Sequence, residues 1–171
     1  EQRVKKLLGE PGVEFVPEGN PILRRVAGDP TRPKLNVVIF LEESFGSEFW
    51  GCLGRKGASL TPEMDRLSAE EGMLFTNIYA SGNRTVRGFE GVLSSFPPLP
   101  GDSIVKRDLS GNVETIARVL KRDGYSTVFL YGGRGIFDGM RSFAVNNGYD
   151  RFVERKHFEH PTFTTIWGVC D

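Results

Sequence analysis

The sequence predicts an α/β domain with a mainly parallel sheet flanked by helices. Residues 35–41 include six apolar residues in an almost continuous run, typical of a strand buried on both faces. Two more apolar runs follow, and segments with helical patterning separate all three, as in parallel sheets. The 21 glycines, many at turn positions, indicate tight connections between strands and helices.

The elements are expected in a definite order, beginning with a polar lead-in. Residues 1–34 are rich in proline, lack clear periodicity and are predicted to be an irregular or partly helical linker, so the domain itself spans 35–171. Residues 35–42 are the first strand. A helix follows with Thr61 as N-cap, Pro62 at its first position and Gly72 as its stop.

The second half continues the alternation of strands and helices. Residues 73–80 are expected to be a strand, and 82–95 a loop entering a helix. An amphipathic helix is predicted over 112–124, and a third strand over 125–133. The last expected features are a short helix and turn over 141–152 and a loop-like end over 160–171.

Composition excludes several functional classes. Lys+Arg and Asp+Glu are both 22, so nothing favours binding to nucleic acid. No apolar run approaches the roughly 20 residues that cross a bilayer, and no signal-peptide pattern opens the chain. Cys52 and Cys170 fit no zinc-ligand spacing. No P-loop or dinucleotide-binding glycine motif follows the first strand.

Three segments that carry chemistry are expected at the carboxyl ends of the strands, where open parallel sheets place their sites. They are Glu42–Glu43–Ser44, the loop that holds Thr85, and the glycine loop after Leu130. Thr85 lies between Arg84 and Arg87. Residue type alone favours a helix N-cap at Thr85, and it leaves open that the two glutamates cap the following turn.

Three blocks in this order carry a family resemblance: residues 36–44, 60–80 and 114–133. The sequence resembles the sulfatase-type branch of the alkaline phosphatase superfamily over about residues 35–152. The resemblance implies a three-layer sandwich, and it implies that 35–171 is the N-terminal half of a truncated catalytic domain. The segments Gly148–Phe152 and 162–168 are most similar to lipoteichoic-acid-synthase-like, or phosphoglycerol transferase, proteins.

The resemblance implies that Thr85 is the covalent nucleophile. In the family, the nucleophile comes ten residues after the phenylalanine that corresponds to Phe75. Formylglycine forms by oxidation of a primary Cβ, and threonine carries a methyl group there, so a formylglycine sulfatase is disfavoured. An unmodified threonine is similar to the nucleophile of the phosphoethanolamine transferases and lipoteichoic acid synthases. The implied activity is therefore a metal-dependent phosphotransferase or phosphodiesterase.

The resemblance also implies a divalent metal, either manganese, magnesium or zinc. The implied ligands are Glu43 and Thr85, with Glu42 as the alternative carboxylate. The family's other ligands, an aspartate and an Asp–His pair, are expected beyond residue 171, so this chain alone is expected to be inactive. His157 and His160 are three residues apart and do not match that pair.

Arg84 and Arg87 are the candidate ligands of the substrate's anionic group. Here the chain departs from the family. Phe89 takes the place of the sulfatase arginine, and Asp138 and Met140 take the places of a tryptophan and an arginine that contact the head group in lipoteichoic acid synthases. Arg134 or Arg141 is the possible replacement for that charge.

Two alternative functions are a sulfuric ester hydrolase on the same scaffold and a degenerate, non-catalytic binding domain. The implied partner is a phospholipid or a small phospho- or sulfo-ester, with no nucleic acid. The resemblance implies an extracytoplasmic location, anchored to a membrane by a segment absent here. Self-association through a free strand edge is expected for this chain.

Overall fold

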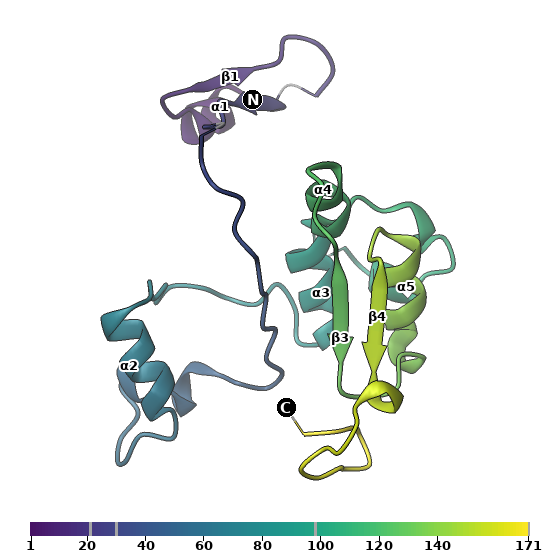
Figure 1. Cartoon of the computed structure of the whole chain (residues 1–171). Coiled ribbons are helices and arrows are strands. Elements are labelled where there is room, and N and C mark those ends of the chain that lie inside the picture. Colours follow the sequence, from purple (N-terminus) through teal and green to yellow (C-terminus); the bar gives the residue numbers. More distant parts are fainter. Residues whose placement is uncertain (21, 30, 98, 171) are drawn as a thin grey trace. The chain divides into compact units, whose positions relative to one another are not determined.

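The structure is a computed structural model that describes residues 1–20, 22–29, 31–97 and 99–170 (Figure 1). The chain divides into two compact units, Glu1–Glu42 and Glu43–Asp171.

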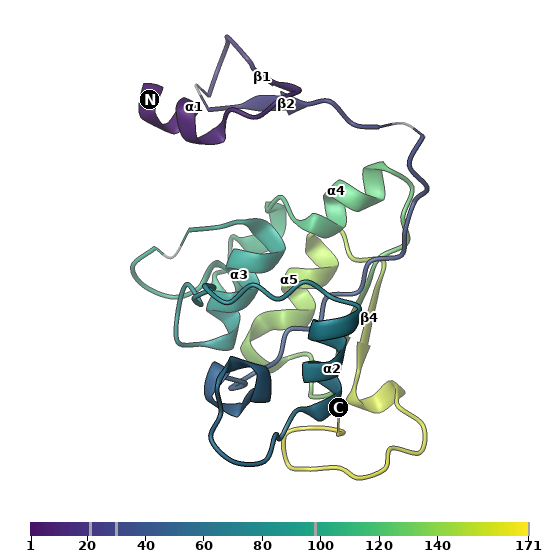
Figure 2. The ribbon, with the colours of Figure 1, turned by 90° about the vertical axis from the view of Figure 1, so that its left-hand side faces the viewer.

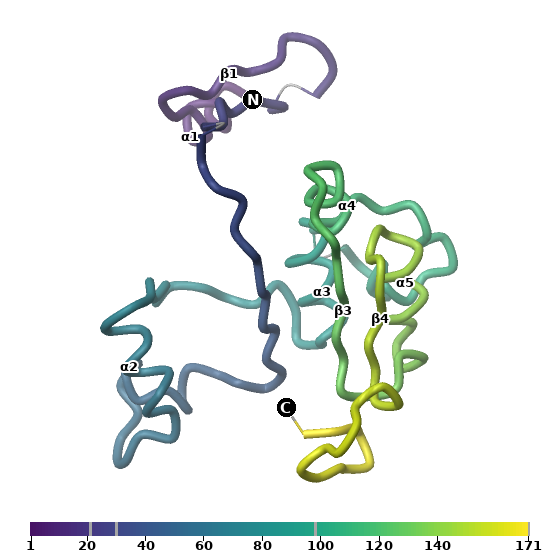
Figure 3. Tube along the Cα trace, viewed as in Figure 1, coloured from purple at the N-terminus to yellow at the C-terminus, as the bar shows by residue number. Residues whose placement is uncertain are grey.

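The first unit contains a short helix and a hairpin. Helix α1 spans Gln2–Leu8, and strands β1 (Val13–Phe15) and β2 (Arg24–Val26) pair antiparallel (Figure 3). The sequence predicted only a partly helical lead-in, so the hairpin is an addition. None of the residues of α1 is buried, so this unit has little apolar core of its own.

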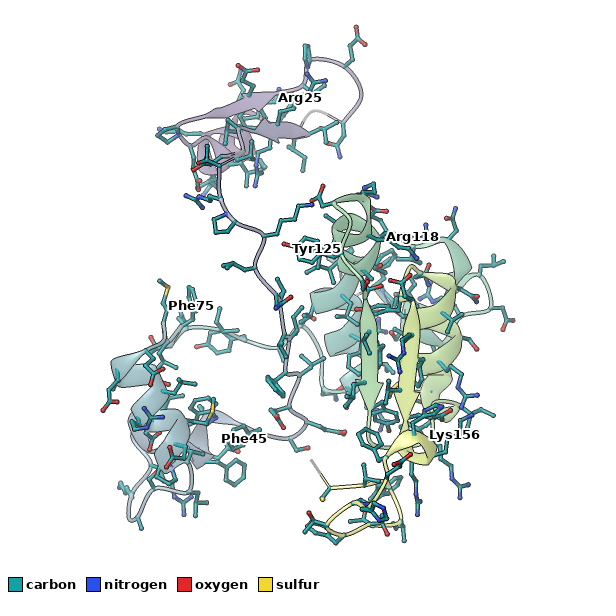
Figure 4. The ribbon with its side chains drawn as sticks, in the orientation of Figure 1. Arg25, Phe45, Phe75, Arg118, Tyr125 and Lys156 are labelled. Atoms are coloured by element: carbon teal, nitrogen blue, oxygen red, sulfur yellow. The ribbon has the colours of Figure 1, made fainter. Side chains whose placement is uncertain are left out.

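Two predicted strands, at 35–42 and 73–80, are not formed, and both predictions are wrong for this structure. Residues 35–42 are extended but pair with no described strand, and Phe40 is 82% exposed. In the second segment Phe75 is 67% exposed (Figure 4). A buried strand needs hydrogen-bond partners for its backbone, and neither segment has a described neighbour that supplies them. The apolar composition of these two segments was therefore insufficient to predict a strand.

The helix predicted after Thr61 is confirmed as α2, Pro62–Glu70. Two 3₁₀ turns, Ser47–Phe49 and Gly51–Leu53, precede it. Thr61 occupies the N-cap position, but its hydroxyl donates to Asp65 Oδ1 at 3.1 Å and accepts from the Gly51 N–H at 3.2 Å. Thr61 therefore ties the turns to α2 instead of capping the helix backbone.

The remaining helices and strands form an α/β layer. They are α3 (Thr85–Ser94), α4 (Ile116–Arg122), β3 (Val128–Tyr131), α5 (Met140–Asn146) and β4 (Arg151–Glu154). In the described residues, 3₁₀ turns at Ile104–Lys106, Ser110–Asn112 and Phe137–Gly139 lie between them, and another, Arg155–His157, follows β4.

Strands β3 and β4 pair in parallel, with Phe129 opposite Phe152. The parallel character predicted from sequence is confirmed, but β4 was expected to be part of a turn. Helices α3 and α5 lie on one side of this pair (Figures 1 and 2). On the opposite face Val128 and Leu130 are 50% and 65% exposed. One face of the sheet is thus covered within the described residues.

The core lies between these helices and the covered face. Phe129 of β3 meets Phe89 of α3 edge-on, with ring centroids 5.6 Å apart, and stacks on Phe152 at 5.1 Å. The core is completed by residues that are at most 8% exposed: Val86, Leu93, Val105, Met140, Phe143 and Ala144.

A fully buried amide links the connecting turns to α5. Asn147 donates to the carbonyls of Ser110 at 2.6 Å and Phe143 at 2.8 Å, and it accepts from the Val113 N–H at 2.7 Å. These bonds hold the 3₁₀ turn Ser110–Asn112 and the extended residue Val113 that follows it, so α4 begins at Ile116, with Thr115 as N-cap, and not at 112.

Candidate active site

Thr85 is the first residue of α3 and is partly buried. The N-cap position belongs to Arg84, whose side chain makes no capping bond; its carbonyl accepts from the N–H groups of Arg87 at 2.9 Å and Gly88 at 3.3 Å. The N-cap interpretation of Thr85 is therefore wrong by one residue. The threonine instead lies in the first turn, where the positive end of the helix dipole favours anions.

Helix α3 is anchored on its buried side. Val86, Phe89 and Leu93, spaced three and four residues apart, pack into the core. Phe89, which takes the place of the sulfatase arginine, is 8% exposed and contacts Phe129. It therefore serves packing and positions the helix against β3.

Glu90 is a buried carboxylate on the same helix, 1% exposed. Its Oε1 accepts from Arg87 Nη1 at 2.6 Å, and its Oε2 accepts from the Ser103 hydroxyl at 2.7 Å and the Ile104 N–H at 2.8 Å. Burial raises the pKa of Glu90, but these three hydrogen bonds outweigh burial and hold the pKa below its usual value. Glu90 is consequently an ionised, fully paired group.

The two arginines beside Thr85 have different surroundings. Arg84 is exposed and forms no ion pair with any described residue. The Arg87 side chain is only 16% exposed, pairs with Glu90 and also donates to the Gly101 carbonyl. Arg84 is therefore free to meet a substrate anion, whereas much of the hydrogen-bonding capacity of Arg87 is occupied.

Glu43 is exposed. The pKa of Tyr131, the last residue of β3, is raised by burial and then by the negative charges of Glu43 and Asp138. The Glu43 carboxylate is thus within electrostatic range of the last residue of β3. Among the residues that the structure describes, no three or more His, Cys, Asp or Glu side chains are grouped to hold a metal ion. Glu42 and Glu43 both stay predictions as ligands.

The loop after β3 is held by hydrogen bonds to β4 and the C-terminal segment. The Gly135 N–H donates to Glu154 Oε2 at 2.7 Å, and the Val169 N–H donates to the Gly132 carbonyl at 3.0 Å. Residues Thr165 and Gly168 form a tight turn here, and a Cβ added at Gly168 would collide with the Gly132 carbonyl. The loop is thus fixed by close backbone approach.

Neither substrate position inferred from the resemblance in this loop presents a free polar side chain. Asp138 has a φ of 51° and pairs with Lys106 at 3.3 Å, and Met140 is 2% exposed in the core. Of the proposed replacements, Arg134 is exposed, whereas Arg141 pairs with Glu154. Arg134 is therefore the freer of the two cations in this loop.

Histidine does not form a metal site in the described residues. His157 Nδ1 accepts from the Glu154 N–H at 3.0 Å, so this histidine closes the turn after β4. His160 is exposed and has a φ of 55°.

The lowered pKa of Glu154 predicts that the fold loses stability in acid. Hydrogen bonds from Arg141 and then from the Gly135 N–H lower the pKa of Glu154 to about 2. Because the folded pKa lies below the unfolded value, Glu154 stabilises the fold above about pH 4–5, and this contribution is lost as the pH falls towards 2. Glu154→Gln should therefore lower the melting temperature at pH 7 and do so much less at pH 2.5. Glu159→Gln, an exposed neighbour, is the control; an equal effect of Glu154→Gln at both pH values would contradict the prediction.

Residues 35–169 match the model of the Sulfatase family. A solved structure from Vibrio parahaemolyticus, described as a protein in the alkaline phosphatase superfamily, is 46% identical, with a TM-score of 0.68 over 74% of this chain and 30% of that one. The lipoteichoic acid synthase LtaP from Listeria monocytogenes shares the fold, with 22% identity and a TM-score of 0.53 over 64% of this chain and 27% of that one.

This chain accordingly spans 30% of the length of the Vibrio protein and 27% of the Listeria protein. No helix within the described residues is long and apolar enough to cross a membrane. The family match covers 35–169, more than half of the chain, and includes Thr85, α3 and the β3–β4 pair. The chain belongs to the sulfatase family, within the alkaline phosphatase superfamily.

Proposed function

We propose that the complete protein is a metal-dependent phosphotransferase or phosphodiesterase, of the phosphoglycerol- or phosphoethanolamine-transferring type, with Thr85 as its nucleophile. The observation that carries the proposal is the position of Thr85 in the first turn of a well-anchored helix, next to the free guanidinium of Arg84. The fold shared with a lipoteichoic acid synthase supports the same class of chemistry.

The proposed reaction has two balanced steps. In the first, Thr85 Oγ1 forms a bond to phosphorus and loses its proton, while the ester bond breaks and the departing alcohol oxygen takes up a proton. In the second, an acceptor hydroxyl or water loses its proton and attacks phosphorus, and Thr85 leaves with its hydroxyl restored. Arg84 binds the phosphoryl oxygens, and Arg87 lies one helical turn further on.

A divalent metal, with manganese as the first candidate and magnesium or zinc as the others, is part of the proposal. Glu43 and Thr85 are the ligands proposed from this chain, and the remaining ones are proposed to lie beyond residue 171. Two ligands are too few for tight binding. Calorimetry of the 171-residue chain should therefore detect manganese binding no tighter than about millimolar. Tight binding that is lost in a Thr85→Ala/Glu43→Ala double variant would contradict the proposal of half a site.

A substrate comparison tests the function itself. We expect the complete protein, supplied with manganese, to cleave bis(p-nitrophenyl) phosphate faster than p-nitrophenyl sulfate. The family match keeps a sulfuric ester hydrolase as the second candidate. Preference for the sulfate, or sulfatase activity gained by Thr85→Ser through formylglycine, would favour that candidate. The natural substrate is proposed to be a phospholipid or small phosphoester, met at an extracytoplasmic membrane face.

A further inference from the structure

The Glu90 carboxylate and its partners form a compact group that we name the Glu90 clamp. It consists of Arg87, Glu90, Ser103 and the backbone of Gly101 and Ile104. Apart from the Arg87–Glu90 pair within α3, every bond runs between α3 and the segment that enters the 3₁₀ turn Ile104–Lys106. These bonds connect α3 to a segment 13 to 17 residues away in sequence.

The Glu90 clamp also fixes the part of α3 that contains Thr85. The Ser103 oxygen lies 3.0 Å from the Val86 carbonyl and 2.7 Å from Glu90 Oε2. Arg87 adds a second link, since its guanidinium joins Glu90 to the Gly101 carbonyl. Val86 is the next residue after Thr85, so the backbone beside the proposed nucleophile is fixed from its buried side.

A buried ion pair adds little net stability to the packing of a helix. Desolvation offsets most of its attraction, and apolar residues of the same volume often stabilise a fold better. Val86, Phe89 and Leu93 already supply apolar contacts on the same helix. The clamp instead fixes the orientation of α3, because hydrogen bonds to a carboxylate restrict rotation and translation of the helix more narrowly than apolar packing does.

We infer that Glu90 is a positioning residue for Thr85, and that Arg87 acts through Glu90 and not directly on the substrate. This inference rests on the proposed function. The two arginines beside Thr85 then have different roles: Arg84 binds the substrate anion, and Arg87 holds α3 in position. Glu90 itself does not touch the reacting atoms.

The test compares Glu90→Gln with Glu114→Gln in the complete protein. Glu114 is a matched control, since it also pairs with an arginine, Arg122, but is exposed. We expect Glu90→Gln to lower kcat for bis(p-nitrophenyl) phosphate by about 10- to 100-fold per folded molecule, with KM within about twofold, because small displacements of a reacting group have effects of this size. Hydrogen exchange should accelerate at the Arg87 and Gly88 amides and stay unchanged at Phe143.

A purely structural Glu90 gives a different result. It would lower the melting temperature and the folded fraction but leave kcat per folded molecule unchanged, and that outcome overturns the inference. If Glu90→Gln does not fold, Ser103→Ala removes one bond of the clamp and should lower kcat in the same direction; full activity of folded Ser103→Ala is then the overturning result.

Two failures are distinguishable. If Thr85→Ala retains full activity, the proposed nucleophile is wrong, and positioning of Thr85 falls with it. If Thr85→Ala is inactive while Glu90→Gln is as active as Glu114→Gln, the nucleophile stands and only the clamp's role is wrong.

Discussion

Thr85→Ala is expected to lower kcat of the complete protein by roughly 10³-fold or more, because loss of a covalent nucleophile removes the intermediate itself. The substitution deletes a partly buried hydroxyl in the first turn of α3, and alanine is the best helix former, so folding should be preserved. The measurement is kcat and KM for bis(p-nitrophenyl) phosphate, with circular dichroism to verify the fold.

Ser94→Ala provides the control for Thr85→Ala. Ser94 is a hydroxyl residue at the other end of α3, where it donates to the Glu90 carbonyl at 2.6 Å. It should leave turnover within about twofold, as expected for a change remote from the chemistry. Equal effects of the two variants would remove Thr85 from the mechanism. Thr85→Ser should retain activity, since it keeps the hydroxyl.

Phe143→Ala is expected to lower the free energy of unfolding of this chain by about 3–5 kcal/mol, because it leaves a cavity in the core. Phe143 is 1% exposed and packs among α3, β3 and α5. Phe40→Ala makes the same chemical change at a side chain that is 82% exposed, and its expected effect is within about 0.5 kcal/mol. Denaturant unfolding of both variants measures the difference.

The Phe40 variant also decides between sequence and structure at residues 35–41. The sequence predicts a strand buried on both faces, and the structure leaves this segment extended and exposed. If Phe40→Ala destabilises as much as Phe143→Ala, Phe40 is buried in solution and the exposed arrangement is wrong.

The sequence predicted those elements whose signals are local. Three such elements formed: the helix that begins at Pro62, the helix that contains Thr85 and the strand that ends at Tyr131. The apolar spacing and turn residues that predict them act over a few residues. Strands 35–42 and 73–80 did not form, because a strand depends on distant partners that no local pattern supplies. Strand β4 was not predicted, because its two apolar residues, Phe152 and Val153, lie between charged residues and form too short a pattern.

In the candidate site, too, local features were predictable from sequence and tertiary ones were not. The position of Thr85 at the start of a helix followed from sequence, and the different surroundings of Arg84 and Arg87 did not. Arg87 and Glu90 are three residues apart on a helix, a spacing typical of an exposed ion pair. Residues 101–104, well separated in the chain, cover the pair and turn it into a buried one. Only the tertiary contact distinguishes the two cases.

The tight turn at Thr165–Gly168 determines which sequences this loop tolerates. The Gly168 backbone lies so close to Gly132 that alanine, the smallest substitution, already collides with a carbonyl. Its neighbours Ile166 and Trp167 are 87% and 73% exposed. A saturation mutagenesis library selected for folded protein would therefore accept nearly every residue at 166 and 167 and almost none but glycine at 168. That sharp step in tolerance between adjacent codons would reveal the contact between the C-terminal segment and the β3 loop without any structure determination.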